Sequence, residues 1–249
     1  MKLNNSLFYP LNIVMILFVM AIPFTACDDD NDIDDTRTFT VTIQNVSTAA
    51  TLQPGALPDR TAPLSPGAWA VYDDGSIFNL NQEANLAVER LAEEGMPDLI
   101  TADLNAATWV EDNGEFSAPA GANGPVIGSG ESVTFTFDAN PGDQLQIMTM
   151  FGNSNDWFYA FGNGGLDLFD NDNDPVSGDV TAELELYDAG TELDEMPGLG
   201  VTQKPDHPTT INIGPADPVD QIQIAAIRHS AFIIPATNSV IRVTVASSL

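Results

Sequence analysis

Acidic side chains gather in one stretch of forty residues and have no cationic neighbours in sequence there. Twelve of the 36 Asp and Glu residues lie between Asp156 and Glu195, and no Lys or Arg occurs between Arg90 and Lys204. Carboxylates without cations suit a hard, oxygen-seeking ion. Ca2+ takes about six to eight oxygen ligands in irregular geometry, whereas Mg2+ demands a near-octahedral site. The stretch therefore favours a Ca2+ site over a Mg2+ site.

One acidic segment within this stretch has the beginning of an EF-hand pattern but not its remaining positions. The run Asp170 to Asp174 alternates Asp and Asn. The sixth position is Pro175, where such a loop needs Gly, and the twelfth is Thr181, where it needs a bidentate Glu. We expect a polar hairpin tip here.

Enzyme signatures are missing from the sequence. The two histidines are His207, between two prolines in a turn, and His229, which follows an expected strand over 222–227. Neither has a zinc-site spacing, and no G-x-S-x-G elbow or phosphate-binding P-loop occurs. Pairs of carboxylates carry little information in a chain with 36 acids. We expect a protein that is not an enzyme, with an extracellular hydrolase as the alternative.

The net charge excludes one class of partner. At -29, with a sequence pI of about 4.1, the chain repels phosphate backbones, because nonspecific binding to nucleic acid depends on Lys and Arg. Hydrophobic residues nevertheless make up 43% of the chain and charged residues only 17%. The sequence therefore predicts a folded core and no nucleic-acid partner.

The N-terminal segment is typical of an exported bacterial protein. Residues 1–26 read as a signal peptide, whose uncharged run is shorter than the about 20 residues of a spanning helix. The one cysteine, Cys27, follows Phe24-Thr25-Ala26, which resembles a lipobox that usually has Leu at the place of Phe24. We expect a lipid at Cys27 as the sole membrane attachment. The alternatives are an ordinary signal peptide cut near Cys27, or a buried thiol.

An acidic tether follows the cysteine. Residues 28–35 hold six acids and lack apolar periodicity, so we assign 27–37 to the lipidated Cys and a solvated tether. An acidic run in this place resembles the surface-export signal of bacterial lipoproteins. The expected location is the bacterial outer membrane and cell surface, or the extracellular space; a spacer without an address is the alternative.

Residues 38–249 read as one domain with mostly β-structure. Apolar residues alternate with polar ones in several short segments bounded by turns, which indicates an antiparallel sandwich or barrel. These segments begin near Phe39, Val133, Leu145, Ile222 and Ile241. An amphipathic helix is predicted over Leu80–Glu94, with Asn79 as N-cap and Gly95 as its stop. A second short helix over Pro97–Ala107 and a long loop over Glu111–Gly130 complete the expectation.

Five ordered motifs make the chain similar to a known family. Ser154-Asn155-Asp156-Trp157-Phe158 and Asp188-Ala189-Gly190-Thr191-Glu192 resemble the S-x-D-W-F and D-A-G-T-D motifs of the spondin N-terminal domain, of the F-spondin and mindin type. The other three motifs lie at Leu64–Tyr72, Leu91–Gly95 and Ile127–Glu131. The resemblance covers about residues 38–245.

The resemblance implies a fold, a metal site and a role. The fold would be a C2-like antiparallel β-sandwich with one or two short helices inserted after the early strands. Its Ca2+ ligands would be Asp156, Asp188 and Glu192; the family usually has Asp at the last position, so Asp194 is a possible substitute. The implied role is adhesion or matrix contact with an unknown surface glycan or matrix protein. A passive surface component is the alternative.

Overall fold

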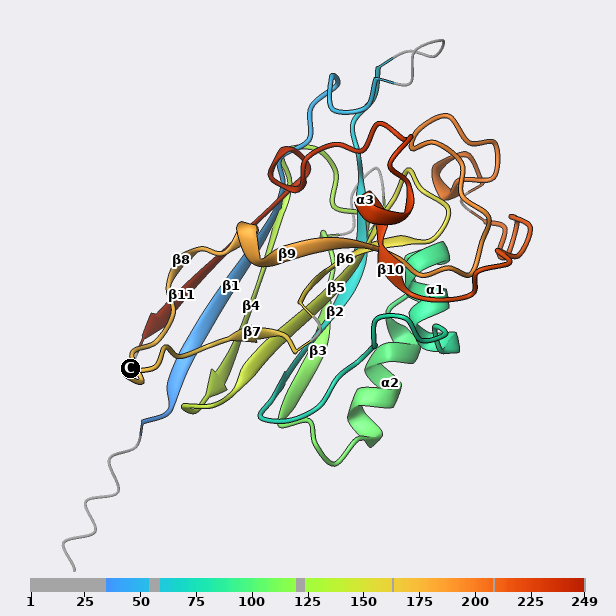
Figure 1. Cartoon of the computed structure of the whole chain (residues 1–249). Coiled ribbons are helices and arrows are strands. Elements are labelled where there is room, and N and C mark those ends of the chain that lie inside the picture. The colour runs from blue at the N-terminus through green and yellow to red at the C-terminus, as the bar shows by residue number, and fades with distance from the viewer. Residues whose placement is uncertain (1–34, 54–58, 120–123, 163, 208, 249) are drawn as a thin grey trace, which may run out of the picture. The chain divides into compact units, whose positions relative to one another are not determined.

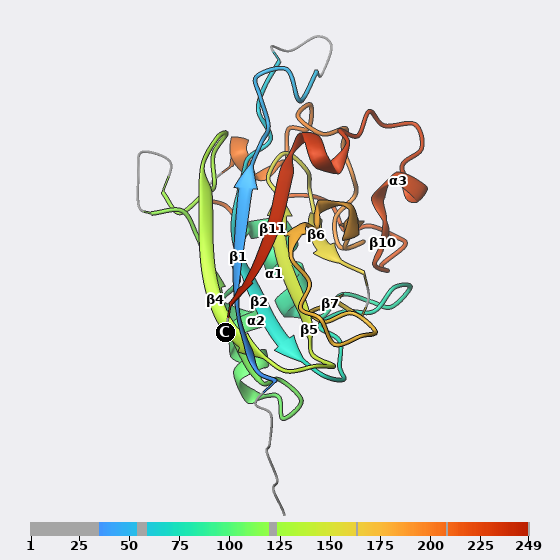
Figure 2. The same cartoon turned by 90° about the vertical axis from the view of Figure 1, so that its left-hand side faces the viewer.

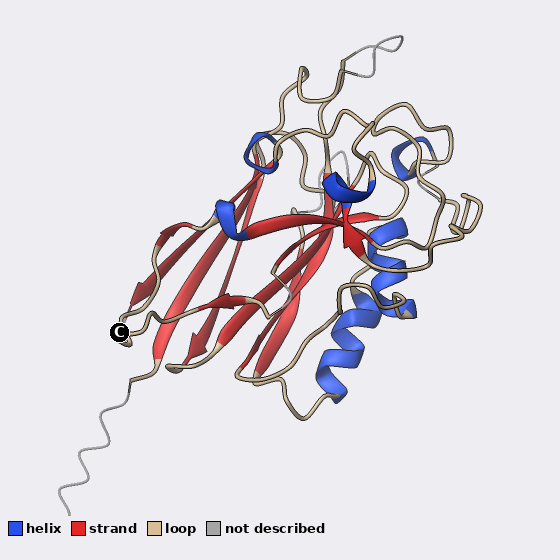
Figure 3. Ribbon diagram, viewed as in Figure 1, coloured by secondary structure: helices blue, strands red, loops and turns tan. Residues whose placement is uncertain are grey.

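Two antiparallel sheets contain all the strands in the part of the chain that the structure describes (Figures 1 and 3). The computed structural model describes residues 35–249 except 54–58, 120–123, 163, 208 and 249. The predicted signal peptide, Cys27 and most of the acidic tether lie outside the described residues. No helix of the described part has the length and apolarity that crossing a membrane requires.

The first sheet has four strands. It contains the strands that alternation predicted near the beginning and the end of the domain. In spatial order the strands are β4 (Ser132–Ala139), β1 (Arg37–Asn45), β11 (Ile241–Ser248) and β8 (Gly178–Asp179). Figure 2 shows β4, β1 and β11 side by side. Phe39, Val41 and Ile43 are fully buried, whereas the residues between them are partly exposed. The inward face of this sheet therefore supplies one half of the core.

The second sheet has seven strands and is covered on both faces. Its spatial order is β10 (Gln223–Ile224), β9 (Leu184–Asp188), β6 (Trp157–Phe161), β5 (Gln144–Phe151), β2 (Leu64–Tyr72) and β3 (Asp112–Phe116), with β7 (Leu166–Asp167) also paired to β5. One face meets the first sheet, and Trp157 points into that core. Phe158 joins a second apolar cluster with the helices α1 (Leu86–Glu94) and α2 (Asp98–Ala106). Coverage on both sides explains why every residue of β6 is buried.

Short helices complete the described structure, and they lie mostly in the C-terminal third. They are α3 (Ala225–Arg228) and the 3-10 helices η1 (Thr181–Glu183), η2 (Lys204–Asp206) and η3 (Thr237–Ser239). The expected strand over 222–227 was therefore wrong beyond Ile224, where α3 begins. This change of direction matters because it carries the next residues, Arg228 and His229, toward the end of β9.

The predicted first helix begins six residues late. Asn85, rather than Asn79, is the N-cap, and its side chain accepts a hydrogen bond from the backbone N–H of Val88. Residues before it are held elsewhere: Asn81 has a left-handed φ of 61°, and its N–H donates to the carbonyl of Ile222. The predicted stop at Gly95 is confirmed, with a φ of 66°.

The predicted loop over Glu111–Gly130 contains a strand. Residues Asp112–Phe116 form β3, the edge strand beside β2, and its polar sequence concealed it. Gly114 allows this pairing because a Cβ there would lie 2.9 Å from the indole Nε1 of Trp69. The loop expectation was wrong because an edge strand needs few apolar residues.

Candidate metal centre

Two of the predicted ligands lie at the adjoining ends of neighbouring strands. Asp156 directly precedes β6, and Asp188 is the last residue of β9. The pairing of these antiparallel strands places Trp157 opposite Asp188. Both carboxylates are fully buried. The sheet itself therefore brings together two acids that lie far apart in sequence.

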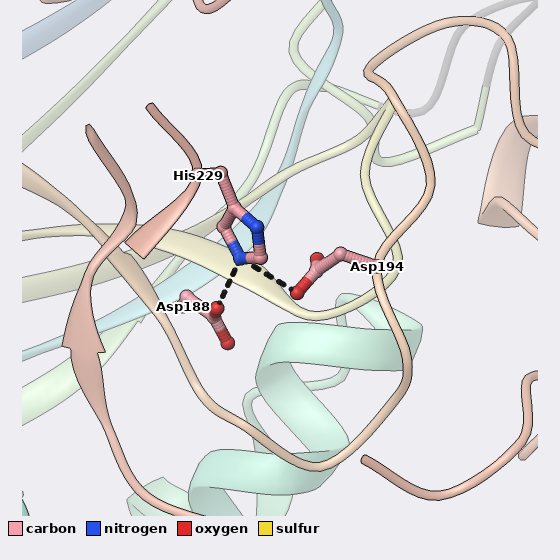
Figure 4. Close-up of side chains that lie close together, drawn as sticks. All are labelled: Asp188, Asp194 and His229. Carbon is pink, nitrogen blue, oxygen red and sulfur yellow. Dashed lines mark hydrogen bonds and ion pairs between the residues drawn. The ribbon is translucent and has the colours of Figure 1, made fainter. Parts of the chain in front are cut away.

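A third carboxylate and an imidazole meet Asp188 at this point (Figure 4). The His229 Nε2 lies 2.6 Å from Oδ2 of Asp188 and 2.9 Å from Oδ2 of Asp194. One possible ligand atom from each of the three residues lies within 4.8 Å of the others. Asp194 comes from the loop after β9, and His229 comes from the C-cap of α3.

Asp188 receives donors on both of its oxygens. Its Oδ1 accepts a hydrogen bond of 2.7 Å from the N–H of Gly190, and Oδ2 lies 3.0 Å from Nε of Arg228 as well as close to His229. Arg228 also forms an ion pair with Asp217. The side chain of Arg228 is only 10% exposed. This buried cation compensates part of the negative charge that the acids place here.

Only one of the two carboxylate oxygens of Asp156 has hydrogen-bond donors. Its Oδ2 accepts hydrogen bonds from the backbone N–H groups of Thr191 and Glu192, at 2.7 and 3.0 Å. Its Oδ1 is buried and has no hydrogen-bond partner among the described residues. Burial, together with the charges of Asp194 and Asp188, raises the pKa of Asp156 well above its usual value. A buried carboxylate oxygen without a donor indicates a place for a cation.

Asp194 has the same deficit. Both of its oxygens are buried, and neither has a hydrogen-bond partner among the described residues, although Nε2 of His229 forms an ion-pair contact of 2.9 Å with Oδ2. Burial raises the pKa of Asp194 to about 6, although the nearby His229 partly opposes this shift. Burial alone lowers the pKa of His229, but its contacts with Asp188 and Asp194 raise it to about 9. The imidazole is therefore a proton donor to the acids at neutral pH.

The remaining predicted ligand, Glu192, turns its carboxylate elsewhere. Its Oε1 accepts a hydrogen bond of 2.8 Å from the N–H of Gly214. Its backbone N–H, not its carboxylate, contacts the predicted site, by donating a hydrogen bond to Asp156. The structure thus brings together Asp156, Asp188 and Asp194, the residue expected as a possible substitute for Glu192.

Arg228 and His229 were missed as members of this centre. The expected continuation of the strand to Ile227 concealed the turn that brings them in. A signal existed: Arg228 is the one Lys or Arg between Lys204 and Arg242, and His229 is adjacent to it. In a chain so poor in cations, adjacent Arg and His residues have a high chance of pairing with buried acids.

The donor set fits a hard cation. Oδ1 of Asp156 and the carboxylate of Asp194 are buried without a hydrogen-bond partner in the described part of the chain, with only the ion-pair contact of His229 at Asp194, and Asp188 lies beside them. Oxygen donors of this kind suit Ca2+, whereas His229 is a ligand type more usual for Zn2+. Because Nε2 of His229 already donates toward Asp188, the carboxylates are the groups available to hold a metal ion.

These features define an all-β sandwich with a buried acid cluster where two strands end and long loops begin. The family model of the spondin N-terminal domain (Spondin_N) matches residues 72–239, more than half of the chain. The chain belongs to the spondin N-terminal domain family, a domain of the extracellular type, and the family predicted from the sequence is confirmed. A search of the curated proteins gave no match.

Proposed function

We propose that this protein is an extracellular Ca2+-binding domain that mediates adhesion or matrix contact and is displayed as a surface lipoprotein. The family supports the extracellular setting. The acid cluster at Asp156, Asp188 and Asp194 supports the metal. The observation that carries the proposal is Oδ1 of Asp156, which is buried, has no donor among the described residues, and is close to two further carboxylates.

The metal ion would have a structural role. It would join the ends of β6 and β9 to the loop that holds Asp194. The end of β9 and the loop that holds Asp194 continue into the long loops between β9 and β11, which Figure 1 shows gathered above the helices. Fixing these loops would prepare a surface for a partner, which we propose to be a surface glycan or a matrix protein.

The burial of the cluster supports a binding role over an enzymatic one. Asp156 and Asp188 have no exposed surface, and the side chain of Asp194 is 2% exposed. A polymer chain needs access to the acids that hydrolyse it. We therefore propose that the protein is not an enzyme. This part of the proposal would be overturned if the protein hydrolysed a polysaccharide and the variant Asp194→Asn, still folded, did not.

The Ca2+ site is tested by thermal unfolding of the purified protein in calcium and in chelator. Calcium at a hundred to a thousand times its Kd should stabilise the native state by about 3–4 kcal/mol. Asp156→Asn should remove most of this increment, because it replaces a charged ligand with a neutral group of the same shape. Asp172→Asn, on the exposed tip between β7 and β8, makes the same charge change away from the cluster. Equal increments in both variants would refute the site.

The lipid anchor is tested separately, because Cys27 lies outside the described residues. Cells that produce the protein should incorporate labelled fatty acid into it and retain it in the membrane fraction. Cys27→Ser should abolish both. Protease treatment of intact cells should digest the protein if it is displayed on the outer surface. Labelling that persists in Cys27→Ser would contradict the anchor.

A further inference from the structure

The strand β4 forms one edge of the first sheet and lacks the features that usually protect such an edge. Within the described residues it pairs with β1 alone, and Figure 2 shows it as the outermost of β4, β1 and β11. Natural edge strands are short, or carry Lys, Pro, a β-bulge or an inward-pointing charge, because their free backbone groups would otherwise pair with another chain. Strand β4 has eight residues in continuous register with β1, no Lys or Pro, and one charged residue, the exposed Asp138.

The other edges in the described part of the chain are protected. Strands β8 and β10, which end the two sheets on one side, have two residues each. Strand β3, which ends the second sheet on the other side, has five residues and carries Asp112 and Glu115. These acids repel the approach of another acidic chain. The contrast singles out β4 among the edges that the structure describes.

Alternate residues of β4 direct their backbone N–H and C=O groups away from the domain. Asn45 of β1 donates its N–H to the carbonyl of Glu131, directly before β4. Because hydrogen-bonded pairs alternate along an antiparallel ladder, the odd-numbered residues of β4 bond to β1 and the even-numbered residues face the open edge. The even-numbered residues are all exposed, and they are Ser132, Thr134, Thr136 and Asp138. Their backbone groups are available to a further strand.

A half-buried aromatic ring lies at the middle of this edge. Phe135 packs against the core but remains partly exposed, whereas Val133 and Phe137 on the same face of β4 are buried. The ring of Phe135 stacks on Trp69, with centroids 5.0 Å apart, and on Phe116, with centroids 5.8 Å apart. A row of aromatic rings therefore reaches the edge, and a strand added beside β4 would cover its last member.

We propose that a second copy of this chain occupies the edge, with its β4 antiparallel to the first and the two Phe135 residues opposite each other. In this register Thr134 lies opposite Thr136 of the second copy, and Ser132 lies opposite Asp138. The residues with free backbone groups thus meet in hydrogen-bonded pairs. The two Phe135 side chains meet at the centre as a cross-strand aromatic pair. No acid of one β4 faces an acid of the other, and the two four-stranded sheets become one continuous sheet.

The distribution of charge favours contact between two copies at this edge. Each chain has a net charge of -29, so two copies repel each other at long range. The outward face of β4, β1 and β11 is instead rich in neutral hydroxyl groups, those of Thr38, Thr40, Thr42, Thr134, Thr136 and Thr244. Approach along β4 therefore brings few acids together. Salt screens the repulsion between the rest of the two chains, so the dimer should strengthen as the ionic strength rises.

Sedimentation equilibrium of the purified protein over a range of concentrations tests the proposal. We expect the mass of two chains at high protein concentration in about 0.15 M salt, and a smaller share of dimer in about 0.01 M salt. Thr134→Pro removes an N–H that faces the open edge and leaves the hydrogen bonds to β1 in place, so it should give the mass of one chain. Circular dichroism of each variant verifies its fold.

An exchange of charges tests the register. The double variant Thr134→Lys with Thr136→Lys places like charges opposite each other in the dimer and should be a monomer, and the corresponding double Glu variant should be one as well. A mixture of the two should restore the dimer, because each Lys then lies opposite a Glu. The control Thr40→Lys with Thr244→Lys adds the same charge to the same face on β1 and β11, away from the edge, and should keep the dimer.

Two results would overturn the proposal as a whole. One is a wild type with the mass of one chain at every concentration and both salt levels, and the other is a dimer that persists in Thr134→Pro. A mixture of the Lys and Glu variants that stays monomeric would overturn the pairing about Phe135. The proposal does not rest on the function proposed above, because none of these substitutions touches Asp156, Asp188 or Asp194.

Discussion

The imidazole of His229 lies 2.6 Å from the carboxylate of Asp188, so the residue after a short helix is tied to the last residue of a central strand. The same imidazole lies nearly parallel to two neighbouring rings, with its centroid 5.3 Å from that of Trp157 and 4.9 Å from that of Phe232. Neighbouring aromatic faces stabilise a protonated imidazole. This contact joins the long C-terminal loop to the second sheet.

The first prediction concerns the loss of the acid that holds this arrangement. Asp188→Asn leaves Arg228 and His229 buried beside a neutral amide. Removing one partner from a buried ion pair costs about 3–5 kcal/mol. We expect a decrease of this size in the free energy of unfolding, measured by urea denaturation in chelator so that metal binding does not contribute. Asp172→Asn should change the same quantity by less than about 0.5 kcal/mol. Similar losses in the two variants would contradict the buried pair.

The second prediction concerns pH. The pKa of His229 rises from 6.5 to about 9 in the folded protein, because the opposing effect of burial is outweighed by Asp188 and Asp194. A raised histidine pKa contributes stability that is fully present below pH 6.5 and is lost as the pH rises through about 9. We therefore expect the wild type to exceed His229→Gln in stability at pH 6, with the difference shrinking by pH 10.

Urea denaturation of both proteins in chelator at several pH values measures this difference. His207→Gln is the control, since His207 is not part of the acid cluster. A difference between wild type and His229→Gln that stays constant from pH 6 to pH 10 would show that His229 does not gain its proton through the acids.

The sequence predicted correctly the strands that bury one face, because apolar and polar residues alternate along them. Val41 and Val245 face each other across β1 and β11, and both follow strict alternation. The first residue of α1 and the strand β3 were predicted wrongly for a different reason. Asn81 is fixed by Ile222, far along the chain, and β3 is recognised only by its pairing with β2. Such tertiary contacts leave no local pattern to read.

The candidate metal centre could also be predicted only in part. Asp156 and Asp188 could be found because motifs mark the ends of their strands. The sequence left open whether Glu192 or Asp194 lies beside Asp188, because the direction of the Glu192 side chain depends on the backbone N–H of Gly214, more than twenty residues later. Arg228 and His229 reach the cluster only because the chain leaves β10 as a helix.

The last prediction concerns the glycine inside the Asp188–Glu192 motif. Gly190 has a φ of 75°, and a Cβ there would lie 2.5 Å from the backbone carbonyl oxygen of Gln221. Gly130 has a similar φ of 82°, but a Cβ there would meet nothing within 4 Å. Gly130→Ala should therefore cost only about 1–2 kcal/mol, from the left-handed backbone alone.

Gly190→Ala should cost more than Gly130→Ala, because the backbone of Gln221 must also move away. That movement would disturb the N–H of Gly190, which donates to Asp188. We expect a larger fall in the midpoint of urea denaturation and weaker calcium binding in Gly190→Ala, with calcium binding unchanged in Gly130→Ala. Equal destabilisation of the two variants would mean that the turn relaxes without cost, and that Gly190 is needed for its φ angle alone.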